Sequence, residues 1–151
     1  VEHGIRRVIN TGPHFTVQGA PYENWDYGIG PEVPPKPSTN LYALSKGLGQ
    51  EVCPIFTEHY DVHVLCYLFY IFCNPEDVKP HRRDWPFLVT WRDAAAAFLP
   101  GLQIDLDILP SKCEVFNVFA NRPHLKFSNE KAKRVLGWEP KDDLVQTYTK
   151  V

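Results

Sequence analysis

The 151-residue sequence contains no methionine, not even at its first position, so we expect a fragment or a processed product. No apolar run approaches the roughly 20 residues that a membrane-spanning helix needs, and the polar start does not resemble a signal peptide. Acidic and basic residues nearly balance, with a formal net charge of -2. This balance gives no electrostatic reason to expect nucleic acid or an anionic membrane as a partner.

The cysteines also lack the spacings that indicate metal sites. Four are present, with no C-x-x-C pair and no finger-like pairing with histidine, so we expect no metal and buried, reduced thiols. Reduced thiols and the absence of a targeting signal predict a cytoplasmic protein.

Apolar periodicity predicts alternating strands and helices within one domain spanning residues 1–151. The expected strands are 7–11, 62–69 and 113–119, and the expected helices are 40–60, 94–102 and 130–136. The near-continuous apolar run at 62–69 is typical of a strand buried on both faces, as in a parallel sheet. The order strand, helix, strand, helix, strand, helix predicts an α/β fold with crossover helices.

The first expected helix has distinct start and break signals. Ser38, Thr39 and Asn40 are each candidates for its N-cap. An apolar stripe of Leu and Val follows at helical spacing, and Pro54 then predicts a kink or break, because an interior proline costs about 3 kcal/mol. Pro100 predicts a bend in the second helix for the same reason.

Tyr42 and Lys46 form the strongest chemical signal in the chain. Four residues apart in an expected helix, they lie on one face, one turn from each other. A free phenol is a poor acid or base at neutral pH, since its pKa is about 10. A nearby ammonium stabilises the phenolate and lets a tyrosine exchange a proton. The pattern is short, and the plain alternative is an exposed helical pair.

Five segments follow one another in a definite order and cover nearly the whole chain. They are R-R-V-I-N-T (6–11) with a following Gly19, P-S-T-N-L-Y-A-L-S-K-G-L-G-Q-E (37–51), the strand and turn at 62–75, V-T-W-R-D-A (89–94), and K-A-K-R-V-L-G-W-E-P (131–140). In this order the five segments resemble the extended short-chain dehydrogenases/reductases, also called the NAD-dependent epimerase/dehydratase family.

The resemblance implies the C-terminal part of a Rossmann-like, doubly wound parallel sheet. It also implies small substrate-side elements around 70–100 and 121–151, and NAD or NADP as cofactor. In such a site Tyr42 is the acid/base, Lys46 assists it and holds the nicotinamide ribose, and Thr11 polarises the substrate oxygen. Tyr70 occupies a position beside the cofactor and substrate that is often Asn in relatives. Relatives often dimerise through the Tyr/Lys helix, which implies a homodimer through the helix of Tyr42 and Lys46.

Members that resemble uronate dehydrogenases give the best match, which implies oxidation of a sugar or uronic acid hydroxyl. His14 falls where they carry a histidine, and either contacts substrate or satisfies its turn. Arg83 falls where they place an arginine on the substrate carboxylate, a role that suits a guanidinium fork. The alternative for Arg83 is a solvated loop charge beside Arg82.

Several departures weaken the match. Gly12 and Pro13 stand where the family carries a serine and an asparagine, which leaves Thr11 as the nearby hydroxyl and Thr16 as a weaker candidate. The family's G-x-x-G-x-x-G loop, which places the cofactor pyrophosphate at a helix N-terminus, is absent from the sequence. The Gly28–Ile29–Gly30 segment does not replace it, because no expected strand precedes it and no expected helix follows.

Two hypotheses therefore stand. In the first, the chain is an incomplete NAD(P)-dependent oxidoreductase acting on a sugar-type substrate, with a nucleotide-sugar epimerase or reductase as the enzymatic alternative. In the second, it is an inactive, truncated paralogue that serves as a binding or structural module.

Overall fold

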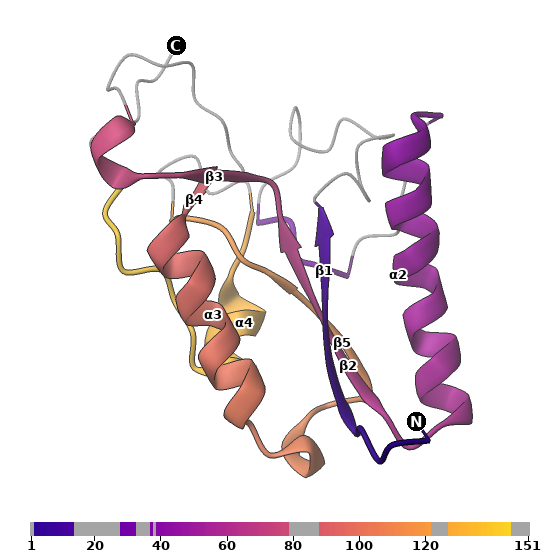
Figure 1. Ribbon diagram of the computed structural model, residues 1–151. Helices are drawn as coiled ribbons and strands as arrows, with labels where there is room; N and C mark the ends of the chain where they lie inside the picture. The colour runs from indigo at the N-terminus through magenta and orange to yellow at the C-terminus, as the bar shows by residue number, and fades with distance from the viewer. Residues whose placement is uncertain are drawn as a thin grey trace.

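The computed structural model describes residues 2–13, 28–32, 37, 39–78, 88–121 and 127–145. Figure 1 shows its central strands with helices on both sides. Among the described residues, no helix is long and apolar enough to cross a membrane. The strands are β1 (Arg7–Pro13), β2 (His63–Phe69), β3 (Ile71–Cys73), β4 (Leu88–Thr90) and β5 (Cys113–Asn117), and the helices are α2 (Leu41–His59), α3 (Trp91–Gln103) and α4 (Glu130–Leu136).

Strands β1, β2 and β5 form a parallel sheet in that order. Arg7 of β1 lies opposite His63 of β2, and Val64 lies opposite Cys113 of β5. The predicted α/β fold with a parallel sheet and helices on both faces is therefore confirmed. The expected strand at 113–119 ends two residues earlier than predicted, and β1 continues through Pro13.

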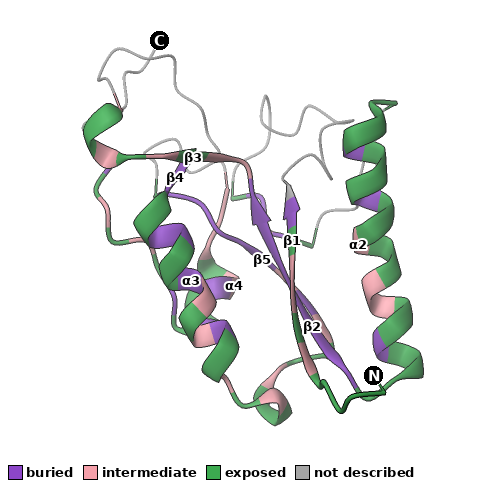
Figure 2. Cartoon of the chain, in the orientation of Figure 1, coloured by how far each residue is buried: buried purple, intermediate pink, exposed green. Residues whose placement is uncertain are grey.

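Strand β2 forms the centre of the molecule, and every one of its residues is buried, as the apolar run predicted (Figure 2). Its side chains alternate between the two layers. Tyr67 points into the core below α3, where its hydroxyl donates to the Ala97 carbonyl at 3.0 Å. Burial raises the pKa of Tyr67 to about 12. Cys66 belongs to the opposite layer, and the Asn10 amide lies 3.7 Å from its sulfur.

Helix α2 begins as predicted but does not break. Asn40 is the cap among the three candidates, because its side chain accepts hydrogen bonds from the backbone N–H groups of Tyr42 and Ala43. The helix then runs through Pro54 to His59, so of the predicted kink or break the break is wrong and the kink stays a prediction. The remaining helical hydrogen bonds and the contacts of α2 with β1, β2 and β5 outweigh the local cost of the proline. Helix α3 likewise continues through Pro100.

The apolar stripe of α2 does not face the sheet. Small or short side chains cover the sheet, with Ala43, Gly47 and Thr57 buried. Figure 2 shows the rest of this helix largely exposed. The large residues of the stripe lie on the exposed face, namely Leu41, Leu44, Leu48, Val52 and Ile55. Helical spacing therefore identified the helix, but not which of its two apolar faces enters the core.

A two-stranded parallel sheet made of β3 and β4 was not expected from the sequence. Each strand has only three residues, too few for a period-two pattern to be read. This small sheet connects β2 to the start of α3, and Ile71 lies opposite Leu88 in it.

The V-T-W-R-D-A segment contacts the L-G-W-E-P segment through Asp93. This buried carboxylate accepts hydrogen bonds from the backbone N–H groups of Lys141 at 2.9 Å and Asp142 at 3.0 Å. The Trp138 indole donates to the Asp93 carbonyl at 3.2 Å. Thr90 caps α3 and donates to the Asp142 carboxylate, whose pKa the Thr90 hydroxyl holds below its usual value. These two recognisable segments thus join the C-terminal residues to α3.

Replacing Asp93 by asparagine tests this connection. The amide has one acceptor oxygen instead of two, so one of the two backbone N–H groups then faces an NH₂ donor. We expect the free energy of unfolding, measured by urea denaturation, to fall by about 2–3 kcal/mol. Glu58→Gln, which neutralises an exposed carboxylate on α2, is the control and should change it by less than about 0.5 kcal/mol. An equal effect of both variants would contradict the role of Asp93.

Candidate active site

The C-terminal ends of β1 and β2 meet the first turns of α2 at one pocket. Parallel strands end at the same edge of a sheet, so Thr11 of β1 and the residues that follow β2 are brought together. The pocket has a volume of about 160 Å³. Its lining residues are Thr11, Gly12, Tyr42, Lys46, Phe69, Tyr70 and Phe72. The structure therefore brings together all four described residues that the sequence singled out, namely Thr11, Tyr42, Lys46 and Tyr70.

Tyr42 and Lys46 are close to each other in this pocket. The Lys46 Nζ lies 5.9 Å from the centroid of the Tyr42 ring, within the range of a cation–π contact. Both side chains are exposed, and Tyr42 retains 56% of its accessible surface. Asn40 fixes the first turn of the helix that carries them. The pair is thus exposed, as the plain reading expected, but it also lines a pocket.

Thr11 supplies an aliphatic hydroxyl to the pocket, whereas the next residue supplies none. A Cβ added at Gly12 would lie 3.2 Å from the Leu68 side chain and 3.6 Å from the Gln50 Oε1. A serine at this position would therefore require its neighbours to move. Thr11 is exposed and carries the one aliphatic hydroxyl among the described lining residues.

Three residues from the sequence analysis fall outside the described residues: His14, Thr16 and Arg83. Their roles stay predictions. The Gly28–Ile29–Gly30 segment lies within the described residues. Its Ile29 carbonyl accepts a hydrogen bond from the Asn117 amide at 3.0 Å. Ile29 also forms an isolated bridge with Phe127, so this segment is tied to the region after β5.

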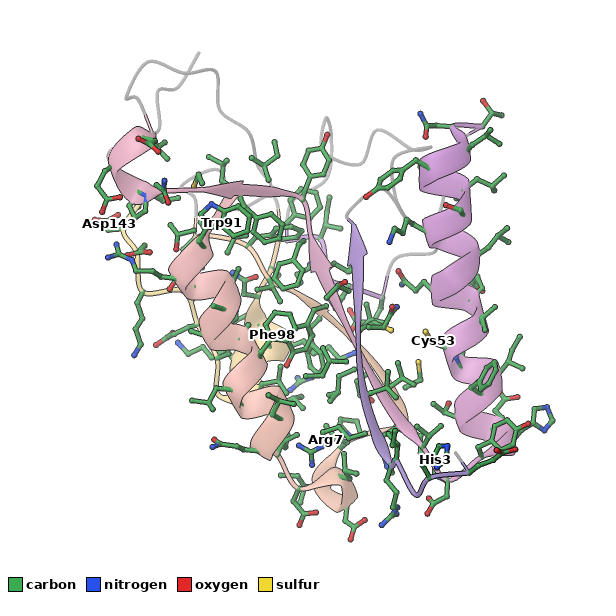
Figure 3. The ribbon with its side chains drawn as sticks, viewed as in Figure 1. His3, Arg7, Cys53, Trp91, Phe98 and Asp143 are labelled. Carbon is green, nitrogen blue, oxygen red and sulfur yellow. The ribbon has the colours of Figure 1, made fainter. Side chains whose placement is uncertain are left out.

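Sequence reasoning missed the two phenylalanines that line the same pocket as Tyr42 and Lys46. Phe69 ends β2 and Phe72 lies in β3, and both line the pocket beside Tyr70. The Phe72 ring stacks on Trp91, with centroids 4.5 Å apart and an interplanar angle of 12°. Figure 3 shows Trp91 at the start of α3 and Phe98 farther along the same helix. The sequence signal for these rings was the group of aromatic residues at the end of the buried strand and just after it. The rings that stack on them, Trp91 and Phe98, lie far away in the sequence.

The pocket suits one end of a dinucleotide cofactor. Pockets for drug-sized ligands measure about 300–1,000 Å³. At about 160 Å³ this pocket is smaller than such sites and holds only part of a dinucleotide. The hydroxyl of Tyr42 and the ammonium of Lys46 are groups that could hold the hydroxyls of a nicotinamide ribose. The sequence holds no G-x-x-G-x-x-G loop for the pyrophosphate, so these residues fit only the nicotinamide end.

Comparison with known proteins gives relatives that are longer than this chain. No protein-family model matches it. An NAD-dependent glucose-6-phosphate dehydrogenase of Haloferax volcanii is 25% identical over 109 residues, which cover 72% of this chain and 39% of that protein. The chain thus spans less than half the length of this curated relative.

Solved structures resemble the chain over most of its length. A glucuronic acid dehydrogenase from Chromohalobacter salexigens matches with a TM-score of 0.69 and 22% identity, over 92% of this chain and 48% of that one. A uronate dehydrogenase from Agrobacterium tumefaciens matches with a TM-score of 0.71 and 19% identity, over 90% and 47%. A UDP-galactose 4-epimerase matches with a TM-score of 0.65 and 16% identity, over 97% and 61%. The chain has the fold of part of these enzymes, and the resemblance read from the sequence is confirmed at this level.

Proposed function

We propose that this chain is the C-terminal part of an NAD(P)-dependent oxidoreductase of the extended short-chain dehydrogenase/reductase family. Its substrate is the hydroxyl of a sugar or uronic acid. The observation that carries the proposal is the convergence of Thr11, Tyr42 and Lys46 on one pocket. The names of the similar proteins support the substrate class, and two of the similar structures are complexes with NAD.

Each of the three residues has a separate task in this mechanism. The carbinol oxygen of the substrate lies between the Thr11 hydroxyl and the Tyr42 phenol, and Thr11 donates a hydrogen bond to it. Tyr42 takes the hydroxyl proton as the substrate becomes a carbonyl compound. Lys46, with its ammonium over the Tyr42 ring, stabilises the phenolate form of Tyr42 that accepts this proton. A nicotinamide cofactor held beside Tyr42 and Lys46 would supply the hydride acceptor for the carbinol carbon.

Further residues complete the proposed site. Lys46 also holds the nicotinamide ribose, and Tyr70 lies against the cofactor from the strand β2 side. His14 and Arg83 contact the substrate, with the Arg83 guanidinium on its carboxylate. The same Tyr–Lys pair serves a nucleotide-sugar epimerase, the enzymatic alternative that the match to UDP-galactose 4-epimerase favours.

The non-enzymatic alternative is a binding or structural module, which is favoured by the short match to the relatives and by the exposed stripe of α2. Titration with NADH or NADPH, followed by tryptophan fluorescence, separates the two. We expect the enzyme to bind one of these cofactors with a micromolar Kd, at about -8 kcal/mol. Absence of binding at millimolar cofactor would support the module instead. Lys46→Met is the control, since loss of the ribose contact should weaken binding.

Tyr42→Phe tests the chemistry. It removes only the phenol oxygen of an exposed side chain, so the fold should persist. Turnover of a uronic acid substrate should fall by at least about 10²-fold, because loss of a general acid/base removes 10²–10⁴ in rate. Tyr60→Phe, at the far end of α2, is the matched control and should keep full turnover. Undiminished turnover in the Tyr42 variant would refute the assigned role.

We also propose a homodimer through α2, the helix of Tyr42 and Lys46. Its exposed face carries Leu41, Leu44, Leu48, Val52 and Ile55, a continuous apolar stripe of the kind that marks an interface. A two-fold axis would place this stripe against its own copy.

Light scattering during size exclusion tests the dimer. We expect the wild-type chain to have twice its monomer mass and Leu48→Lys to shift it to the monomer, because a charge in an apolar interface loses its solvation. Gln103→Lys introduces the same charge at an exposed position of α3 and should leave the dimer unchanged. A monomeric wild-type chain would contradict the proposal.

A further inference from the structure

The side chain of Gln50 carries a buried oxygen without a partner. Its Oε1 is shielded from solvent and accepts no hydrogen bond from the described residues. Burial of an amide oxygen is costly unless a hydrogen bond replaces the lost water, so most buried acceptors in proteins are paired. The unpaired oxygen therefore indicates that a donor reaches it in another state of the site.

The Gln50 oxygen lies beside the candidate active site. A Cβ added at Gly12 would lie 3.6 Å from this oxygen. Gly12 lines the pocket together with Thr11, Tyr42 and Lys46. Gln50 thus adjoins the pocket through the residue that follows Thr11 in β1.

Gln50 follows Lys46 by one turn of α2, just as Lys46 follows Tyr42 by one turn. Long side chains in a helix lean toward its N-terminal end, so Gln50 is expected to lean toward Lys46 and Lys46 toward Tyr42. The contact of the Lys46 ammonium with the Tyr42 ring agrees with this direction. The three residues therefore form one row along α2 beside the pocket.

Lys46 is the donor in this row. Its ammonium has three N–H donors, and the structure records its contact with the Tyr42 ring. Lys46 is exposed, and a cation–π contact at an exposed site is weak, whereas an unpaired buried acceptor is costly. A shift of the ammonium toward Gln50 therefore removes the larger cost at the expense of the smaller gain.

The Gln50 amide is a neutral acceptor in surroundings without carboxylates. The titratable groups among the described lining residues are Lys46, Tyr42 and Tyr70. The helix positions three and four residues before and after Lys46 hold no acidic residue. A carboxylate at position 50 would offset the charge of the ammonium, whereas an amide oxygen holds the ammonium and leaves its charge to act on Tyr42.

We propose that Gln50 is a positioning residue for Lys46, whose ammonium donates a hydrogen bond to the Gln50 Oε1 and is thereby held beside the pocket. Gln50 acts through Lys46 and touches neither substrate nor cofactor. The contact is a property of the chain alone, whereas its effect on proton transfer by Tyr42 rests on the proposed function.

Acetylation of the Lys46 amine tests the contact in the chain without cofactor. Dilute acetic anhydride reacts with the uncharged amine, and mass spectrometry of the digested chain gives the rate at Lys46 relative to exposed Lys112. Gln50→Leu should raise this ratio about three- to tenfold, because a hydrogen bond to an acceptor favours the charged ammonium. Gln50→Glu should lower the ratio, since a carboxylate favours the ammonium more strongly.

The opposite directions of the two variants separate a specific contact from a general loosening of α2, which would raise the ratio in both. Gln103→Leu and Gln103→Glu make the same exchanges at an exposed position of α3 and should leave the ratio unchanged. Circular dichroism confirms the fold of each variant. An unchanged ratio in both Gln50 variants, or a rise in both, would overturn the proposal.

The pH dependence of turnover tests the effect on Tyr42. We expect oxidation of D-glucuronate with NAD to rise with pH, and Gln50→Glu to move the midpoint of this rise upward by about half a unit or more, because the carboxylate weakens the stabilisation of the phenolate. Gln103→Glu should keep the wild-type midpoint. Turnover that depends on Tyr42 but keeps its midpoint in Gln50→Glu would refute the effect on Tyr42. The expected acetylation ratios in a chain without turnover would retain the contact and reject the oxidoreductase.

Discussion

Helix α2 packs against β1 and against the segment before it through residues that lack bulky side chains. A Cβ added at Gly47 would lie 3.1 Å from the Pro37 ring, and one added at Gly12 of β1 would lie 3.6 Å from the Gln50 Oε1 of the helix. Ala43 is buried on the same face of the helix. With so little free space, rotation of α2 about its axis would produce overlaps. Tyr42 therefore stays turned toward the strand ends, and the geometry of the pocket depends on glycine and alanine as much as on the reactive groups.

The sequence predicted the parts of the fold whose causes are local. Strand β2 follows from its continuous apolar run, and α4 ends at Gly137, whose φ of 68° is the left-handed conformation that favours glycine. One prediction failed and one feature was missed where distant contacts decide. The break at Pro54 does not occur, because the contacts of α2 with the sheet hold the helix together. The small sheet of β3 and β4 depends on pairing across a long connection, which no short pattern reveals.

The candidate site likewise has some features with local causes and others that depend on distant contacts. The spacing of Tyr42 and Lys46 is a helical property, so their closeness was predictable from the sequence. Thr11 was identified through its strand and its resemblance to a family turn. Phe69 and Phe72 were not, because their partners Trp91 and Phe98 lie in α3, farther along the sequence than a local pattern reaches. Local patterns thus supply reactive groups, whereas the shape of the space between them comes from tertiary packing.

The order of the sheet has one more consequence. In the described part of the chain, β1 has a hydrogen-bonded strand on one side only, that of β2. The backbone N–H and C=O groups on the other side of β1 point along the plane of the sheet, away from β2. The pairing of β1 with β2 places Thr11 opposite Tyr67. Additional strands can join this margin without shifting that register. The addition of strands at this margin and the pairing of β1 with β2 are therefore separable.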